Sequence, residues 1–345
     1  MVGLLVLSCS KDSSTPSLNT TQAQAAIGDV NTNLASDIGT LSSTAGNAAL
    51  NSFTNLTSTT SPFGRIKSFN KPGEIKAAMS AGLISIRQMI LKGTSNERVQ
   101  GDDTPFDFNG KKGIYNYNLD TKAFVKSQET STIIKIRYPK DANSVTNDAE
   151  LQITAYTDVQ TSDGYQPTAV EAAIYISDTK EVGLSLTAQY NLDKGEPVKA
   201  SIAVFINPFT ITFSFDNTPA TSASESFSLS KSGTVLIGVG ATATWASAND
   251  KENGEPRAAS GYLQLKNVRF SIAVDGSKAA TATSRGDFIV ITVSADGAIA
   301  GHVVWVGTSV DNEEPYMQYN DGTTREALSS VFADLSNQLQ ALVNG

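Results

Sequence analysis

The sequence predicts an α+β fold: a large curved antiparallel β-meander, forming an open or half-barrel sheet, with helices packed on its concave face. From residue 115 onward apolar and polar residues alternate, which is typical of strands with one covered and one solvated face. Short turn signals separate these strands, and a parallel crossover needs a dozen or more residues, so neighbouring strands are expected to be antiparallel. Three other segments carry apolar residues at helical spacing.

The first of these helical segments spans residues 21–56. Its apolar residues follow one another by three or four, which places them on one helical face: Ile27, Val30, Leu34, Ile38 and Leu41. The second helix is expected at residues 74–91, with Pro72 near its start and Gly93 after its end. The third is expected in residues 321–345, where Thr323 and Glu326 have capping-box spacing.

The strands show their period of two most clearly between residues 182 and 190. Five apolar residues there alternate with Gly183, Ser185, Thr187 and Gln189, which predicts one apolar and one polar face. The pattern repeats in residues 198–206, 209–215, 235–245 and 288–293. A phase change at Lys266-Asn267 predicts a β-bulge.

The expected organisation is a single sheet domain with N-terminal additions. The boundaries are 1–8 for a signal-peptide remnant, 9–20 for a lipidated tether, 21–92 for helices packing on the sheet, 93–320 for the sheet and 321–345 for the C-terminal helix.

Composition excludes several classes of function. The net charge of −8 argues against nucleic acid as a partner, because binding phosphates needs clustered Lys and Arg. The single cysteine excludes an internal disulfide and a multi-cysteine metal site. The single histidine, His302, lies in an apolar run that reads as a strand, without the elbow motif of a serine hydrolase. We therefore expect no enzyme activity, no cofactor and no metal.

The N-terminus carries the strongest compartment signal. Leu4, Leu5, Val6 and Leu7 precede Ser8 and Cys9. The run from Val6 to Cys9 resembles the lipobox of bacterial lipoproteins, which implies that the Cys9 thiol receives a diacylglycerol group. The apolar stretch is short and has no preceding basic residue, so we expect an additional segment upstream. The alternative is a hydrophobic N-terminus with a free cysteine.

The residues after Cys9 refine the location. Ser10, Lys11 and Asp12, followed by a polar Ser- and Thr-rich stretch, are similar to the export signals of Bacteroidetes surface lipoproteins. Two later features, the Tyr115–Tyr117 hairpin and the Tyr-Asn-Asp-Gly-Thr run from Tyr319, also resemble uncharacterised lipoproteins of that group. The resemblance implies an outer-membrane lipoprotein, surface-exposed in one variant, whose membrane partner is reached through its anchor.

The leading functional hypothesis is a non-enzymatic binding or scaffold module. In one variant a cavity between sheet and helices holds an acyl chain, in an architecture similar in outline to the Lol-type lipid carriers. Its expected lining is Leu184, Leu186, Ile202, Val204, Phe213 and Val239. The alternative is that the helices fill this space as ordinary core.

Glycans provide the competing hypotheses. The acidic segment from Asp311 to Asp321 also contains Tyr316 and Tyr319, whose rings are candidates for stacking on a sugar. A glycan hydrolase would require two carboxyl groups about 5–10 Å apart. Acidic turns are more commonly only solvated.

Overall fold

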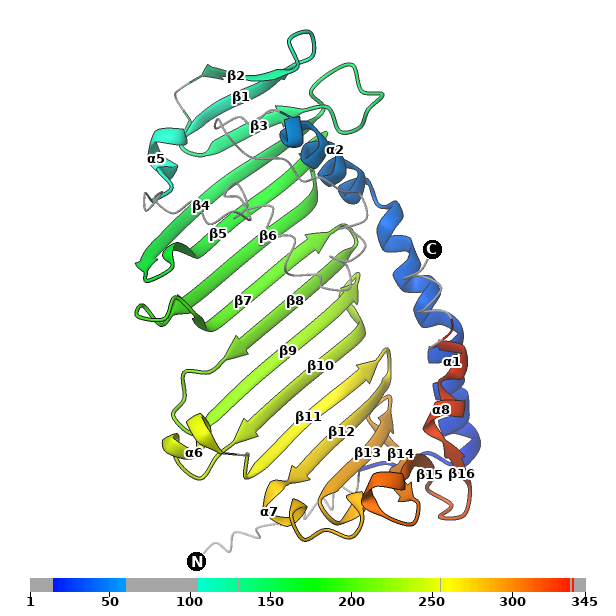
Figure 1. The fold of residues 1–345 in the computed structure, drawn as a ribbon. Helices are drawn as coiled ribbons and strands as arrows, with labels where there is room; N and C mark the ends of the chain where they lie inside the picture. Colours follow the sequence, from blue (N-terminus) through cyan, green and yellow to red (C-terminus); the bar gives the residue numbers. More distant parts are fainter. Residues whose placement is uncertain (1–14, 60–104, 129–130, 255, 336, 338–345) are drawn as a thin grey trace, which may run out of the picture.

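The computed structural model describes residues 15–59, 105–128, 131–254, 256–335 and 337. Their strands form one open sheet of sixteen strands, in the order β16-β15-β14-β13-β12-β11-β10-β9-β8-β7-β6-β5-β4-β3-β1-β2. Figure 1 shows this sheet as a tall twisted ladder, with two consecutive helices running along one side of it.

The longest strands are β4, β5 and β6, with 13, 13 and 12 residues. In chain order, the strands are β1 (Gly113–Asn118), β2 (Ala123–Gln128), β3 (Ile134–Tyr138), β4 (Ala149–Thr161), β5 (Gly164–Ile176), β6 (Thr179–Tyr190), β7 (Pro197–Ile206), β8 (Phe209–Asp216), β9 (Ser222–Lys231), β10 (Thr234–Thr244), β11 (Ala258–Leu265), β12 (Val268–Asp275), β13 (Ile289–Ala295), β14 (Ala298–Val306), β15 (Glu314–Tyr319) and β16 (Arg325–Ala327). The helices are α1 (Thr20–Gly39), α2 (Ala45–Thr59), α5 (Phe108–Lys111), α6 (Ala248–Asn253), α7 (Gly276–Ala279) and α8 (Leu328–Val331), with 3₁₀ turns η1 (Thr40–Ser43), η2 (Arg285–Asp287) and η3 (Val310–Asn312).

The meander is confirmed from β3 to β16, where each strand pairs antiparallel with its successor. The expectation of a purely antiparallel sheet is wrong at one end, because β1 pairs with β3 in parallel. The chain leaves β1, forms the outer strand β2 and then returns to the other side of β1. This excursion provides the long connection that a parallel pair requires.

The predicted bulge at Lys266-Asn267 is instead a hairpin turn. Leu265 ends β11 and pairs with Val268, the first residue of β12. A two-residue turn also shifts the apolar phase, because both flanking residues face the same side of the sheet. Lys266 adopts the left-handed conformation that this tight reversal needs, with φ of 51°.

Helix α1 packs its apolar stripe on the sheet, as predicted. Ile27, Val30 and Leu34 of α1 are buried, as is Leu41 of η1, and all four share one core with the strands. The helix begins at a capping box, in which the side chains of Asn19 and Gln22 satisfy each other's backbone amides. The predicted single helix breaks into α1, η1 and α2.

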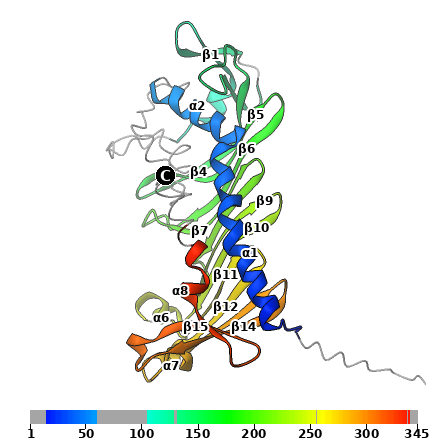
Figure 2. The same ribbon diagram turned by 90° about the vertical axis from the view of Figure 1, so that its right-hand side faces the viewer.

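The N-terminal residues before α1 are fixed to β14. Leu18 N donates to Ile299 O at 2.8 Å, and Ile299 N donates to Pro16 O at 2.7 Å. Asn320 Nδ2 donates to Leu18 O at 2.9 Å. The chain therefore enters the fold at the β14–β16 end, and α1 then leads it back across the sheet (Figure 2).

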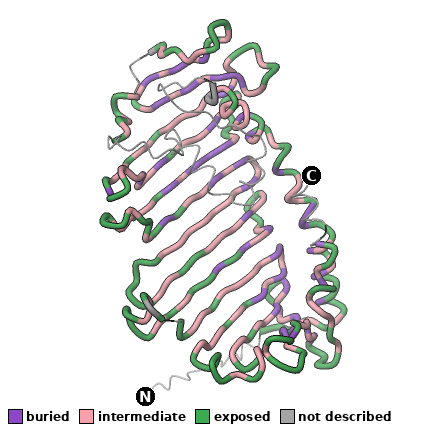
Figure 3. Tube along the Cα trace, in the orientation of Figure 1, coloured by how far each residue is buried: buried purple, intermediate pink, exposed green. Residues whose placement is uncertain are grey.

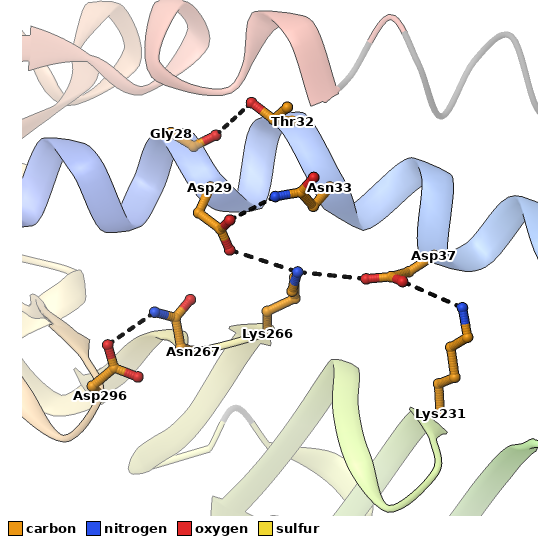
Figure 4. A network of polar contacts seen from close by, with 9 residues as sticks. All are labelled: Gly28, Asp29, Thr32, Asn33, Asp37, Lys231, Lys266, Asn267 and Asp296. Carbon is orange, nitrogen blue, oxygen red and sulfur yellow. Dashed lines mark hydrogen bonds and ion pairs between the residues drawn. The ribbon is translucent and has the colours of Figure 1, made fainter.

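A charged cluster connects α1 with two hairpin turns of the sheet (Figure 4). Lys266 lies between two carboxylates of the helix, 3.6 Å from Asp29 and 3.4 Å from Asp37. Lys231, the last residue of β9, lies 3.3 Å from Asp37. These side chains are all partly exposed, so salt screens their attraction. The apolar stripe therefore dominates the stability of α1, and the ion pairs add contacts between the helix and the ends of two hairpins.

The C-terminal helix begins later than predicted. Residues 321–324 form a turn in which the Asp321 carboxylate accepts from the Thr324 hydroxyl and from the backbone N–H groups of Thr324 and Thr323, and these contacts lower its pKa. Glu326 lies in β16, so the predicted capping box is wrong. Strand β16 pairs with β15 before α8 starts, and Asn31 of α1 donates to the Val331 carbonyl of α8.

Three predicted features lie outside the described residues: the lipidated Cys9, the helix at 74–91, and residues 338–345. Among the described residues, no helix combines the length and hydropathy that crossing a bilayer requires.

Candidate binding face

The central strands carry a continuous line of directly opposed apolar residues on the face that contacts the helices. We call it the apolar row. Its members, one per strand from β5 to β13, are Val170, Leu186, Ile202, Phe213, Phe227, Val239, Leu263, Phe270 and Val293. Side chains on directly opposite residues lie about 4.5–5.5 Å apart at Cβ, so the row forms one uninterrupted apolar strip across nine strands.

The two ends of the apolar row are closed and its middle is open. Val170 and Val293, at the two ends, are almost fully buried. In the middle, Phe213 and Phe227 are partly exposed, and Val239 is 39% exposed. Figure 3 shows that the middle strands are mostly intermediate or exposed along their length, whereas buried segments gather in the upper strands and beside the helices.

The row next to the helices forms ordinary core. Leu184 and Val204 oppose each other there, and Val204 opposes Ile211. Leu184 is 8% exposed and Val204 is fully buried, in the same core as the α1 stripe. The helices therefore cover one end of these strands, and the apolar row lies where that cover stops.

The next row on the other side has mostly small side chains. Ala188 opposes Ala200, and Ala241 opposes Gly261. These small side chains project less far from the sheet than the large side chains of the apolar row. A ligand lying on the row therefore meets no bulky side chain from β6, β7, β10 or β11 in this neighbouring row. Between them, Glu225 opposes both Phe215 and Ala241.

The opposite face of the same strands is polar. Its hydroxyls bond across strands, with Thr212 and Ser228 at 2.7 Å and Ser214 and Ser226 at 2.8 Å. Gly238, which belongs to a run with the spacing G-x-G-x-x-A, lies on this face within β10. The Tyr262 ring lies against it, and Arg269 stacks on that ring at 3.7 Å from its centroid. Gly238 therefore leaves room for the Tyr262 ring, and among the described residues of these strands the continuous apolar strip lies on the helix-side face.

The expected cavity residues separate into two groups. Leu186, Ile202, Phe213 and Val239 all belong to the apolar row, and they lie on four of its nine strands. Leu184 and Val204 belong to the covered core beside it. All six point to the helix-side face, because directly opposed residues share a face.

Two central members of the row were not among the predicted residues. Phe227 lies in β9, whose sequence Ser-Ala-Ser-Glu-Ser-Phe-Ser-Leu-Ser-Lys alternates serine with mixed residues. Leu263 lies in β11. The alternation of residues in β9 could have indicated that Phe227 faces the helices. Glu225 obscures this pattern because it is a charged residue at a position expected to be apolar.

The two candidate stacking tyrosines do not form one platform. They are three positions apart on β15, so their side chains leave opposite faces. Tyr319 is 1% exposed and donates to Glu326 at 3.0 Å; burial and this contact raise its pKa. Tyr316 lies half-buried on the polar face. This arrangement gives a sugar ring no paired aromatic surface.

The other polar candidates are dispersed. Glu313 is buried and accepts from Arg285 N at 2.7 Å, while Asp321 caps the turn after β15. His302 is exposed on the polar face, opposite Gln318. Within the described part of the chain, no group of three or more His, Cys, Asp or Glu side chains is arranged to hold a metal ion.

Tyr156 extends the apolar row at its β4 end. It opposes Val170, and its ring meets Phe106 edge-on at 4.9 Å between centroids. Burial, with a smaller contribution from the nearby Asp158, raises the pKa of Tyr156 to about 12. The phenol is therefore neutral at physiological pH, so this end of the row carries no tyrosinate charge.

Comparisons with known proteins give no relative: no family model matches the chain, and neither do any curated protein or any solved structure.

Proposed function

We propose that this chain is a lipid-anchored protein of the bacterial cell envelope, in the outer membrane, and that it binds an apolar ligand without catalysing a reaction. The observation that carries the binding role is the half-open apolar row. Burying apolar surface is favourable by about 25 cal/mol per Å², and contiguous apolar patches on soluble proteins mark sites of interaction. The row offers a strip about 20 Å long from Ile202 to Leu263, at ~4.8 Å per strand.

The shape of the row favours an extended ligand. Its exposed members lie in a line across β7 to β11 and include two opposed phenylalanines, Phe213 and Phe227. An alkyl or acyl chain laid across the strands contacts every member in turn. A compact ligand contacts only two or three of them and gains less from burial.

Substituting Phe213 by serine is expected to weaken binding of a neutral apolar dye such as Nile red by about tenfold or more. Removing a half-buried ring takes away about 1.5–3 kcal/mol of apolar contact, and 1.4 kcal/mol corresponds to a factor of ten. Fluorescence titration of the purified full-length chain measures the dissociation constant.

Phe205→Ser provides the matched control. Phe205 lies on β7, next to the strand of Phe213, and is also partly exposed. It opposes Gly183 and Thr210 on the polar face, so its loss should leave dye binding unchanged. Equal effects of the two substitutions, with both variants folded by circular dichroism, would contradict a site on the apolar row.

The membrane anchor is supported by the sequence around Cys9 and by the polar residues after it. We expect Cys9→Ala to move the full-length protein from the membrane fraction to the soluble fraction. A thioether-linked diacylglycerol with a further acyl chain provides stable anchoring, at about 0.8 kcal/mol per buried CH₂. Cell fractionation with Ser10→Ala as the control measures the change. Membrane association that persists in Cys9→Ala would rule out the thiol as the anchor.

A further inference from the structure

One carboxylate lies beside the apolar row without a counterion. Glu225 is two residues from Phe227 on β9, on the same face, and it is exposed. It opposes Phe215 on one side and Ala241 on the other. Among the described residues, the Glu225 carboxylate forms no ion pair and no hydrogen bond.

The nearest lysine on this face of β9 is already engaged. Lys231 lies six residues along the strand, about 20 Å away at ~3.3 Å per residue, and it pairs with Asp37 of α1. The neighbours of Glu225 on the adjacent strands, Phe215 and Ala241, supply no side-chain hydrogen-bond donor. Among the described residues, the open part of the face therefore combines a strongly apolar strip with the unpaired carboxylate of Glu225.

Resting on the proposed function, we propose that the ligand is a cationic amphiphile, with its alkyl chain along the apolar row and an ammonium group at Glu225. A ligand covering Phe213 and Phe227 removes water from the carboxylate beside them. Desolvating an unpaired carboxylate is costly, and a cation on the ligand offsets that cost. The Phe215 ring, next to Glu225, also attracts a cation through its face.

The same geometry discriminates against fatty acids. A carboxylate head group at this position would meet Glu225 with like charge, which disfavours binding at close range. A neutral alcohol of the same chain length would gain the apolar contacts alone. The expected order of affinity is therefore amine, alcohol and then carboxylate.

Three twelve-carbon probes test this order: dodecylamine, 1-dodecanol and dodecanoate. They are measured at pH 7 below their critical micelle concentrations, by displacement of Nile red from the full-length chain. We expect dodecylamine to bind at least about threefold more tightly than 1-dodecanol, and dodecanoate at least about threefold more weakly. In Glu225→Gln the three affinities should converge, with that of 1-dodecanol unchanged.

Glu171→Gln is the matched control, because Glu171 lies on the polar face of the neighbouring sheet region and accepts from Ser185. It should leave the order of affinities as in the parent chain. If 1-dodecanol displaces the dye but all three probes bind equally, with no effect of Glu225→Gln, the head-group inference is wrong and the apolar site stands. If none of the probes displaces the dye, both the site and the inference fail.

Discussion

Replacing Leu34 by alanine should lower the free energy of unfolding by about 3–5 kcal/mol. Leu34 is fully buried at the centre of the α1 stripe, in one core with strand residues that are far apart in the sequence. Truncation removes apolar contacts and leaves a cavity that rigid strands close only in part, and both effects destabilise the fold. Urea unfolding of the full-length chain, followed by circular dichroism, measures the loss.

Ser36→Ala is the control for this substitution. Ser36 is exposed on the same helix, and alanine has the higher helix propensity. Its free energy of unfolding should therefore be unchanged or raised by a few tenths of a kcal/mol. A loss below about 1 kcal/mol for Leu34→Ala would show that the docking of α1 contributes little to the stability of the sheet.

Gly301→Ala should destabilise the β14 end of the sheet by about 1–3 kcal/mol or more, the range for overpacking a rigid site. A Cβ atom at Gly301 would clash with the backbone carbonyl oxygen of Gln318, on the paired strand β15. Because backbone within a sheet cannot move away without breaking its ladder, β14 and β15 must separate locally. Hydrogen exchange of the β14 and β15 amides reports this opening.

Gly28→Ala is the matched glycine control, and its effect should have the opposite sign. Gly28 lies within α1, and a Cβ there meets nothing within 4 Å. Alanine in a helix interior is favoured over glycine by about 0.5–1 kcal/mol. Similar destabilisation by both substitutions would mean that the β14–β15 contact is not the cause of the first effect.

Much of the sheet could be predicted because one covered face imposes a period of two on each strand. The strands β6, β7, β8 and β10 follow this rule closely, and their alternation fixed both their extent and their shared apolar face. The α1 stripe was equally clear, because burial at every third or fourth residue is incompatible with a strand.

The errors occurred where local signals had two structural meanings. A phase change in the alternation arises from a bulge or from a two-residue hairpin, and at Lys266-Asn267 only the pairing of β11 with β12 distinguishes them. Likewise, Thr323 and Glu326 have the spacing of a capping box, but pairing with β15 draws Glu326 into a strand. The parallel pair β1 and β3 depends on where β2 returns, which periodicity does not report.

The sequence predicted which residues line the candidate site, but not that they lie opposite one another in a row across the strands. Alternation shows that Leu186, Ile202, Phe213 and Val239 share a face, whereas their alignment depends on the register of each hairpin. Phe227, at the centre of the row, lies in a strand whose serines and Glu225 weaken the apolar pattern. Glu225, which obscured the prediction, is the residue whose charge lies beside the apolar row in the structure.

The bridge from Pro16 and Leu18 to Ile299 has a mechanical consequence for a chain anchored at Cys9 as proposed. From Cys9 to Pro16 the backbone reaches at most about 25 Å when fully extended, so the corner at β14 is tethered within that radius of the bilayer. Strand β2 lies thirteen positions from β14 in the strand order, about 60 Å at ~4.8 Å per strand. The anchored molecule then rotates about the β14 corner. Its β2 end reaches farther from the anchor point than the tether from Cys9 to Pro16 could extend by itself.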